Sequence, residues 1–134
     1  MTRIIQTPQQ RANTIEALNV MWPSVPPENV ISNLCVWRDA ASLRAGMHCG
    51  SLGCFGGWCA VYPAFAEQGI EVDGFGMPYI DGYGGTYAAE PLFGWAGLFQ
   101  IRGLCDVDDH FVGTDHELVT HRLQWLLDNS EVRP

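Results

Sequence analysis

The sequence contains no lysine, and its seven basic residues are all arginines. The missing lysine excludes the phosphate-binding loop of nucleoside triphosphatases and catalysis through a Schiff base, because both depend on a lysine amine. A surface that follows a nucleic-acid backbone needs clustered bases, and these arginines are scattered along the chain. The sequence therefore predicts that the protein does not bind nucleic acid directly.

Acidic residues, by contrast, are abundant, and fifteen of them give a formal net charge of −8. Residues 1–67 hold four acids and four arginines, whereas residues 68–134 hold eleven acids and three arginines and carry the whole excess. This asymmetry favours a face that meets a basic partner, with an ordinary solvated surface as the alternative. Mimicry of DNA is a further alternative, although eight net charges are few for that role.

A secretory leader is not recognisable in residues 1–10, which lack an apolar stretch and a small-residue cleavage site. Five cysteines, an odd number, favour free thiols in a reducing compartment over a disulfide scaffold. We therefore expect a protein that is not secreted. With 134 residues, of which 47% are hydrophobic, the chain is expected to form one domain over residues 1–134.

The first predicted helix begins after Thr7, which is placed to cap it. Pro8 suits the first helical position, and Gln10 is placed to complete a capping box. The helix is expected to run to near Met21, and after the prolines that follow, residues 30–34 are predicted to form a short second helix. The predicted buried stripe of the first helix consists of Ile15, Leu18 and Trp22.

Residues 45–66 form an uncharged stretch that is long enough for a membrane span. Their many glycines and Pro63 favour a buried central helix instead, with Ser51 as its cap. Pro63 should kink or stop this helix, and Gly69 should end it if it resumes. A smooth side for close packing is predicted from Gly53, Gly56, Gly57 and Ala60.

The second half changes pattern at residue 70. Short alternating stretches at residues 70–72 and 77–80 predict a small β-hairpin, and residues 88–101 predict one or two helical turns. Thr114 and Glu117 form a second capping box, before a helix expected to run to about Asp128. The apolar arc of that helix comprises Leu118, Val119, Leu123, Leu126 and Leu127.

Arg122 falls inside this apolar arc. A buried guanidinium must find a carboxylate or backbone carbonyls, so Arg122 is expected to pin the last helix to another element. Together these patterns predict an α+β, mostly helical fold, with three or four helices around an apolar central helix and a small β-hairpin.

Cysteines are concentrated near the central helix, with Cys49, Cys54 and Cys59 at regular spacing and His48 beside the first. A structural zinc site needs a second pair of ligands, which is missing, so free core thiols are favoured and neither a metal nor another cofactor is expected. A reactive thiol is the remaining alternative. Cys54 would then be the candidate, because a helix N-terminus lowers a thiol pKa.

An acidic turn is predicted at Asp106, Asp108 and Asp109. Its spacing to Glu117 resembles a calcium loop, but Phe111 stands where that loop requires glycine, so a solvated turn is expected. The two histidines of the last helix, at positions 116 and 121, are expected to be exposed because their spacing does not place both on one face.

Aromatic residues interleaved with glycine mark residues 74–87. Tyrosine supplies contact area at low entropic cost, so this composition is typical of an interaction surface, with core packing as the alternative. The predicted interaction surface comprises Phe75, Tyr79, Asp81, Tyr83 and Tyr87, together with Asp106, Asp108 and Asp109.

The segment 49–60 resembles a motif, Cys-Gly-Ser/Thr-x-x-Cys-x-x-Gly-Trp/His-x-Ala, of small bacteriophage and bacterial proteins that have no assigned activity. Here Cys49, Cys54 and Trp58 occupy its characteristic positions, while Gly56 and Cys59 depart from it. The resemblance implies a phage origin, a shared fold and a structural role for the two cysteines, but no reaction.

The function expected from these observations is that of a non-enzymatic, phage-encoded protein-binding module with an acidic, aromatic surface. Its partner would be a host or defence protein in the host cytoplasm, or another component of the virion, and no membrane is involved. The alternative is a small thiol- or metal-site enzyme that uses His48, Cys49 and Cys54.

Overall fold

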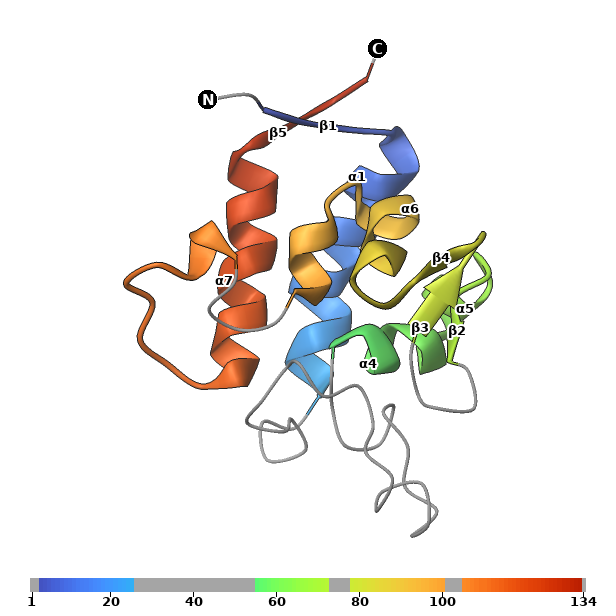
Figure 1. Cartoon of the computed structure of the whole chain (residues 1–134), viewed down its shortest axis with the longest axis horizontal. Helices are drawn as coiled ribbons and strands as arrows, with labels where there is room; N and C mark the ends of the chain where they lie inside the picture. Colours follow the sequence, from blue (N-terminus) through green and yellow to red (C-terminus); the bar gives the residue numbers. More distant parts are fainter. Residues whose placement is uncertain (1–2, 26–54, 73–77, 101–104, 134) are drawn as a thin grey trace, which may run out of the picture.

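A computed structural model describes residues 3–25, 55–72, 78–100 and 105–133 (Figure 1). They form an α+β, mostly helical fold, as the sequence predicts. Helix α7 lies on one side of the molecule and a small antiparallel sheet on the other, with α1 and α6 between them (Figure 1). The α-helices are α1 (Pro8–Glu16), α4 (Phe55–Val61), α5 (Pro63–Ala66), α6 (Ala89–Phe93) and α7 (Asp115–Asp128).

Shorter elements connect these helices. The strands are β1 (Ile4–Gln6), β2 (Glu71–Val72), β3 (Pro78–Ile80), β4 (Tyr83–Gly84) and β5 (Ser130–Val132). Element η1 (Ala17–Met21) is a π-helical turn. The 3-10 turns are η2 (Trp22–Ser24), η4 (Gly85–Ala88), η5 (Ala96–Phe99) and η6 (Asp106–Asp108). Within the described ranges, no helix is long and apolar enough to cross a membrane.

Helix α1 begins as predicted. The Thr7 hydroxyl accepts a hydrogen bond from the Gln10 amide at 3.1 Å, and the Gln10 side chain accepts one from the Thr7 amide at 2.8 Å. The helix widens into η1 and tightens into η2, so helical structure reaches Met21 as expected. The predicted short helix at residues 30–34 lies outside the described residues.

The predicted stripe of this helix is wrong at Ile15, whose side chain is 43% exposed. Asn13 and Thr14 are buried in its place. The physical reason is a set of side-chain amides that bind backbone carbonyls of α6, because the last carbonyls of a helix lack partners within it. These bonds run from Gln6 Nε2 to Phe93 O (2.7 Å), from Gln10 Nε2 to Glu90 O (3.0 Å) and from Asn13 Nδ2 to Leu92 O (2.8 Å).

The described part of the charge-free segment, residues 55–66, forms two short helices rather than one. Tyr62 is extended between α4 and α5, and Pro63 begins α5, so the proline interrupts the helix as predicted. Gly69 follows with a φ of +108°, as expected of a terminator. Gly56 gives the predicted close packing, since a Cβ there would lie 2.8 Å from Pro78 Cγ. The proposed cap Ser51 lies outside the described residues.

Aromatic rings fill the core between α1, α4, α6 and α7. Phe55 packs edge-on against Trp22 and Phe99, with ring centroids 5.2 and 5.6 Å apart. Phe93 bridges this group to Phe65 at 5.5 Å. Helix α7 completes the core with its capping box and its buried side chains as predicted, although Leu127 is only partly buried. The fully buried members are Leu118, Val119, Leu123 and Leu126.

Strands β1 and β5, the first and last described strands, pair in parallel and lie side by side (Figure 1). The Ser130 hydroxyl donates to Gln6 Oε1 at 3.0 Å, and Arg11 Nη1 donates to Leu127 O and to Ser130 Oγ at 3.1 and 2.8 Å. This pairing is not among the elements predicted from the sequence. It anchors the first strand to the end of α7.

Candidate interaction surface

The β-hairpin predicted from residue 70 onward is present as the three-stranded order β2-β3-β4. Strands β3 and β4 are joined by Asp81 and Gly82, which both have positive φ, at +50° and +84°. Two central residues with positive φ match the twist of antiparallel strands, and Asp-Gly is a favoured pair for such turns. Asp81 is therefore held at the tip of a regular turn.

The register of this hairpin separates the predicted tyrosines. Tyr79 pairs with Glu71 across β2 and β3, and its hydroxyl donates to Glu71 Oε2 at 2.6 Å. Tyr83 pairs with Ile80, which is 2% exposed. Because side chains alternate along a strand, Tyr79 and Tyr83 leave opposite faces of the hairpin. A flat patch containing both rings is therefore not formed.

All three described tyrosines of the predicted surface are exposed. The exposed fractions are 38% for Tyr79, 45% for Tyr83 and 61% for Tyr87, which lies on η4 beside β3 and β4. Core packing, the alternative for these rings, is thus not what the structure shows. Phe75 lies outside the described residues.

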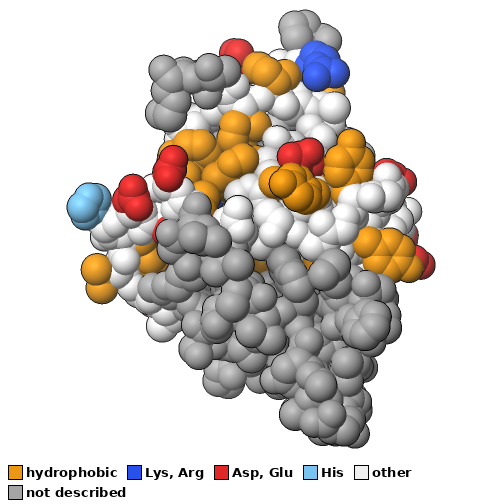
Figure 2. Space-filling view, in the orientation of Figure 1, with side chains coloured by type: hydrophobic (Ala, Val, Ile, Leu, Met, Phe, Trp, Pro, Cys, Tyr) orange, Lys and Arg blue, Asp and Glu red, His pale blue; other side chains and the backbone are white. Residues whose placement is uncertain are grey.

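Carboxylates accompany these rings. Figure 2 shows acidic and large hydrophobic side chains together on the right of the visible face, the side where β3 and β4 lie. We define the hairpin surface as the three tyrosines and the three exposed acids around them. Its members are Glu71, Tyr79, Asp81, Tyr83, Tyr87 and Glu90.

The predicted acidic turn lies far from the hairpin surface. Asp106 and Asp109 are exposed at η6, on the opposite side of the molecule (Figure 1). Asp108 is a correction to the prediction of a solvated turn, because its side chain is only 5% exposed. The predicted surface is therefore two separate regions, and Asp108 is not accessible in either.

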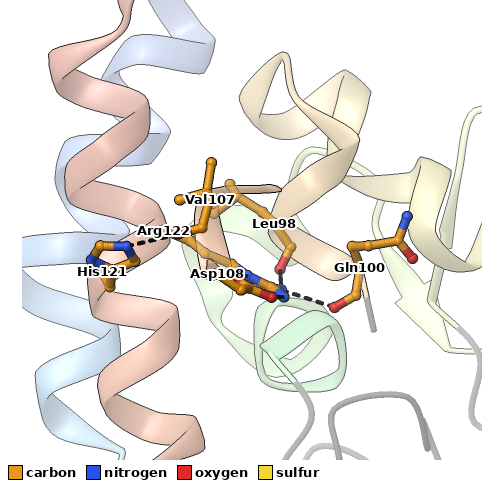
Figure 3. Close-up of polar contacts among 6 residues, drawn as sticks. All are labelled: Leu98, Gln100, Val107, Asp108, His121 and Arg122. Atoms are coloured by element: carbon orange, nitrogen blue, oxygen red, sulfur yellow. Dashed lines mark hydrogen bonds and ion pairs between the residues drawn. The ribbon is translucent and has the colours of Figure 1, made fainter. Parts of the chain in front are cut away.

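Asp108 is buried because it pairs with Arg122 (Figure 3). Arg122 donates from Nε and Nη2 to the two carboxylate oxygens, at 2.9 and 2.6 Å. Its Nη1 donates to Gln100 O at 2.8 Å and to Leu98 O at 3.4 Å. Arg122 thus pins α7 to two other segments, as its place in the apolar arc predicts. This contact is structural.

The histidines of α7 are half-buried, so their predicted exposure is wrong. His116 stacks on Trp22 with ring centroids 4.8 Å apart, and Trp22 Nε1 donates to the His116 carbonyl at 2.8 Å. His121 forms a hydrogen bond with the Val107 carbonyl at 3.0 Å (Figure 3). Its ring also packs against Phe111, with ring centroids 4.8 Å apart. Both rings are held by packing that helical spacing alone did not reveal.

The candidate thiol and metal residues His48, Cys49 and Cys54 lie outside the described residues. Cys59 and Cys105 are free and buried, and burial raises the pKa of both thiols. Trp58 is half-buried on α4, and its Nε1 finds no hydrogen-bond partner among the described residues. Those residues also contain no group of three side chains able to hold a metal ion.

Comparison of the chain with protein-family models, with curated proteins and with solved structures found no match. The hairpin surface therefore has to be judged from its own geometry. Two of its acids, Glu71 and Glu90, were missed by the sequence analysis. The sequence gives a signal for Glu71, since it faces Tyr79 in the predicted hairpin, but none for Glu90.

Proposed function

We propose that this protein is a protein-binding module without catalytic activity and that its partner contacts the hairpin surface, whose Tyr79 and Tyr83 lie on opposite faces of the hairpin. The observation that carries the proposal is the exposure of three tyrosines, at 38, 45 and 61%, on a short sheet fixed by a regular turn. A tyrosine on a rigid support offers a large contact area and a hydroxyl at little entropic cost.

The backbone of β3 is anchored to the core. Ile80 is buried at 2% exposure, and Pro78 packs against Gly56 of α4. This strand therefore needs little further ordering on association, which favours affinity. In line with the phage-like motif, the proposed partner is a host or defence protein, or another component of the virion.

Affinity capture from a bacterial lysate and from phage particles, with the tagged full chain as bait, tests this function. The informative variant combines Tyr79→Thr, Tyr83→Thr and Tyr87→Ser, which keeps strand-forming residues in the hairpin. The matched control combines Asp106→Asn and Asp109→Asn on the opposite side.

The proposal predicts one stoichiometric protein that the wild type and the control retain and the tyrosine variant loses. Far-ultraviolet circular dichroism and the thermal midpoint establish that the tyrosine variant is folded. A partner that the folded tyrosine variant still captures, or no partner from either source, would contradict it.

A further inference from the structure

A groove of about 410 Å³ separates the hairpin from the face of the β1-β5 pair. The hairpin contributes Asp81 and Tyr83 to its lining, and α6 contributes Glu90. The β1-β5 side contributes Ile5 and Arg133. The groove is thus lined by two acids and an aromatic ring together with one base and an aliphatic side chain.

The Gln10 side chain, which also lines the groove, already has hydrogen-bond partners within the chain. The Gln10 amide donates to the carbonyls of Glu90 and Pro91 at 3.0 and 3.3 Å, and its oxygen accepts from the Thr7 amide. Gly94, at a φ of +83°, ends α6 beside it. A ligand must therefore be recognised by the other lining residues.

The two acids that line the groove are available to a partner. Asp81 and Glu90 are exposed, and neither makes an ion pair in the part of the chain that the structure describes. An arginine side chain fits this lining, because its planar guanidinium donates to carboxylates and stacks on an aromatic ring such as Tyr83. Arg133, which also lines the groove, repels the same cation.

A second hollow, of about 550 Å³ between α1 and α5, makes a useful contrast. There Glu16 already accepts a hydrogen bond from the Tyr62 hydroxyl. Asn13 and Gln68 pair their amides reciprocally at 2.8 and 2.9 Å. Most of its polar groups are satisfied within the chain, so this hollow makes a weaker case for a ligand.

We propose that the groove takes an extended, arginine-bearing segment of a partner protein, with the guanidinium facing Asp81 and Glu90 and lying against Tyr83. The partner's apolar side chains would contact Ile5, which also lines the groove. This inference rests on the proposed function, because it names the chemistry of the partner at one edge of the hairpin surface.

Selection of binders from a library of random linear peptides, with the folded full chain as bait, tests the inference. Enriched peptides should carry arginine, and their synthetic forms are then titrated by fluorescence anisotropy at low salt. The double variant D81N/E90Q should bind them roughly tenfold more weakly, as loss of two exposed charge pairs implies. R133Q should bind them more tightly, and D106N/D109N should not differ from the wild type.

Opposite effects from the two groove variants cannot come from unfolding, so the sign of the R133Q effect is decisive. Enrichment of peptides without arginine, no enrichment, or binding that D81N/E90Q leaves unchanged would overturn the inference. Self-association of the chain that D81N/E90Q abolishes would assign the groove to a second copy and also overturn it. A partner that depends on the three tyrosines but not on Asp81 and Glu90 would leave the proposed function standing and refute only the groove.

Discussion

At the scale of single residues, Arg122 shows what a sequence can and cannot specify. Its place in an apolar arc requires a buried partner, and the structure supplies Asp108 at 2.6 and 2.9 Å. Three aspartates lie within four positions of one another, and the sequence does not say which of them turns inward. The η6 turn makes that choice, since it exposes Asp106 and buries the Asp108 side chain.

The first prediction concerns this pair. Asp108→Ala removes the carboxylate partner of the buried Arg122 guanidinium, so the free energy of unfolding should fall by about 3 kcal/mol. Asp109→Ala removes an exposed acid next to it and should change stability by less than about 0.5 kcal/mol. Urea denaturation of both variants measures the difference, and equal values would show that the pair does not support the fold.

A second residue-scale prediction is a pH effect at Glu117. Its carboxylate accepts a hydrogen bond from the Thr114 amide, which lowers its pKa from the ordinary value. A lowered pKa in the folded state contributes stability above the ordinary glutamate pKa, and this is lost as the pH falls through the lowered value.

Glu117→Gln keeps an oxygen acceptor for the cap but cannot titrate. Thermal midpoints of wild type and variant, measured from neutral pH downward, should therefore begin to approach each other near pH 4.3, about the ordinary glutamate pKa, and converge below the lowered pKa of the folded state. Curves that stay parallel through that range would show that the cap does not depend on the charge of Glu117.

At the scale of elements, local signals predicted where helices begin but not always which face is buried. Both capping boxes are present, at Thr7 and at Thr114, because a cap depends on only four neighbouring residues. The buried face of α1 depends instead on α6, whose final carbonyls need donors from a segment about 80 positions earlier. An apolar count could not anticipate a helix that buries amides.

The sequence contains a turn signal, Asp81-Gly82, that predicts a strand after β3. Asp81 and Gly82 form the two-residue turn between β3 and β4, and this pair is among the strongest local indicators of a hairpin. The predicted hairpin comprises residues 70–72 and 77–80 and has no strand after Asp81, which is predicted only as a surface residue. Recognition of the turn would have put Tyr83 opposite Ile80 and separated it from Tyr79.

The prediction at this scale reverses the usual ranking of polar and apolar substitutions. Asn13→Ala leaves the Leu92 carbonyl without its amide donor and should lower the free energy of unfolding by about 2 kcal/mol. Ile15→Ser on the same helix should cost less than about 1 kcal/mol, because the side chain is 43% exposed. Chemical denaturation measures the free energy of unfolding of both variants. A larger loss for Ile15→Ser than for Asn13→Ala would show that Ile15 contributes to the buried face after all.

At the scale of the whole molecule, the ends of the chain and its two acidic regions matter most. Gln6 and Ser130, 124 positions apart, meet in the β1-β5 region, and the patterns considered within each half could not predict that contact. The residue types of the predicted surface likewise do not determine where its members lie relative to one another. Folding places the hairpin surface and the acidic turn on opposite sides.

The core thiols give a prediction about global unfolding. Cys59 has no exposed surface, and burial raises the pKa of its thiol, so the reactive thiolate is scarce in the folded protein. Alkylation of Cys59 by iodoacetamide, followed by peptide mass spectrometry, should be slow in buffer and fast in concentrated urea. Alkylation of Cys59 in buffer at the rate of the unfolded chain would contradict the buried position of α4.

The central claim is that the hairpin surface, not the acidic turn, binds another protein. The most direct measurement is the Kd of the captured partner for three forms of the full chain: the wild type, the tyrosine variant and the Asp106→Asn, Asp109→Asn control. The account predicts that the tyrosine variant binds at least about tenfold more weakly while the control matches the wild type. Weaker binding by the control, with the tyrosine variant unchanged, would place the contact face at η6 and contradict the account.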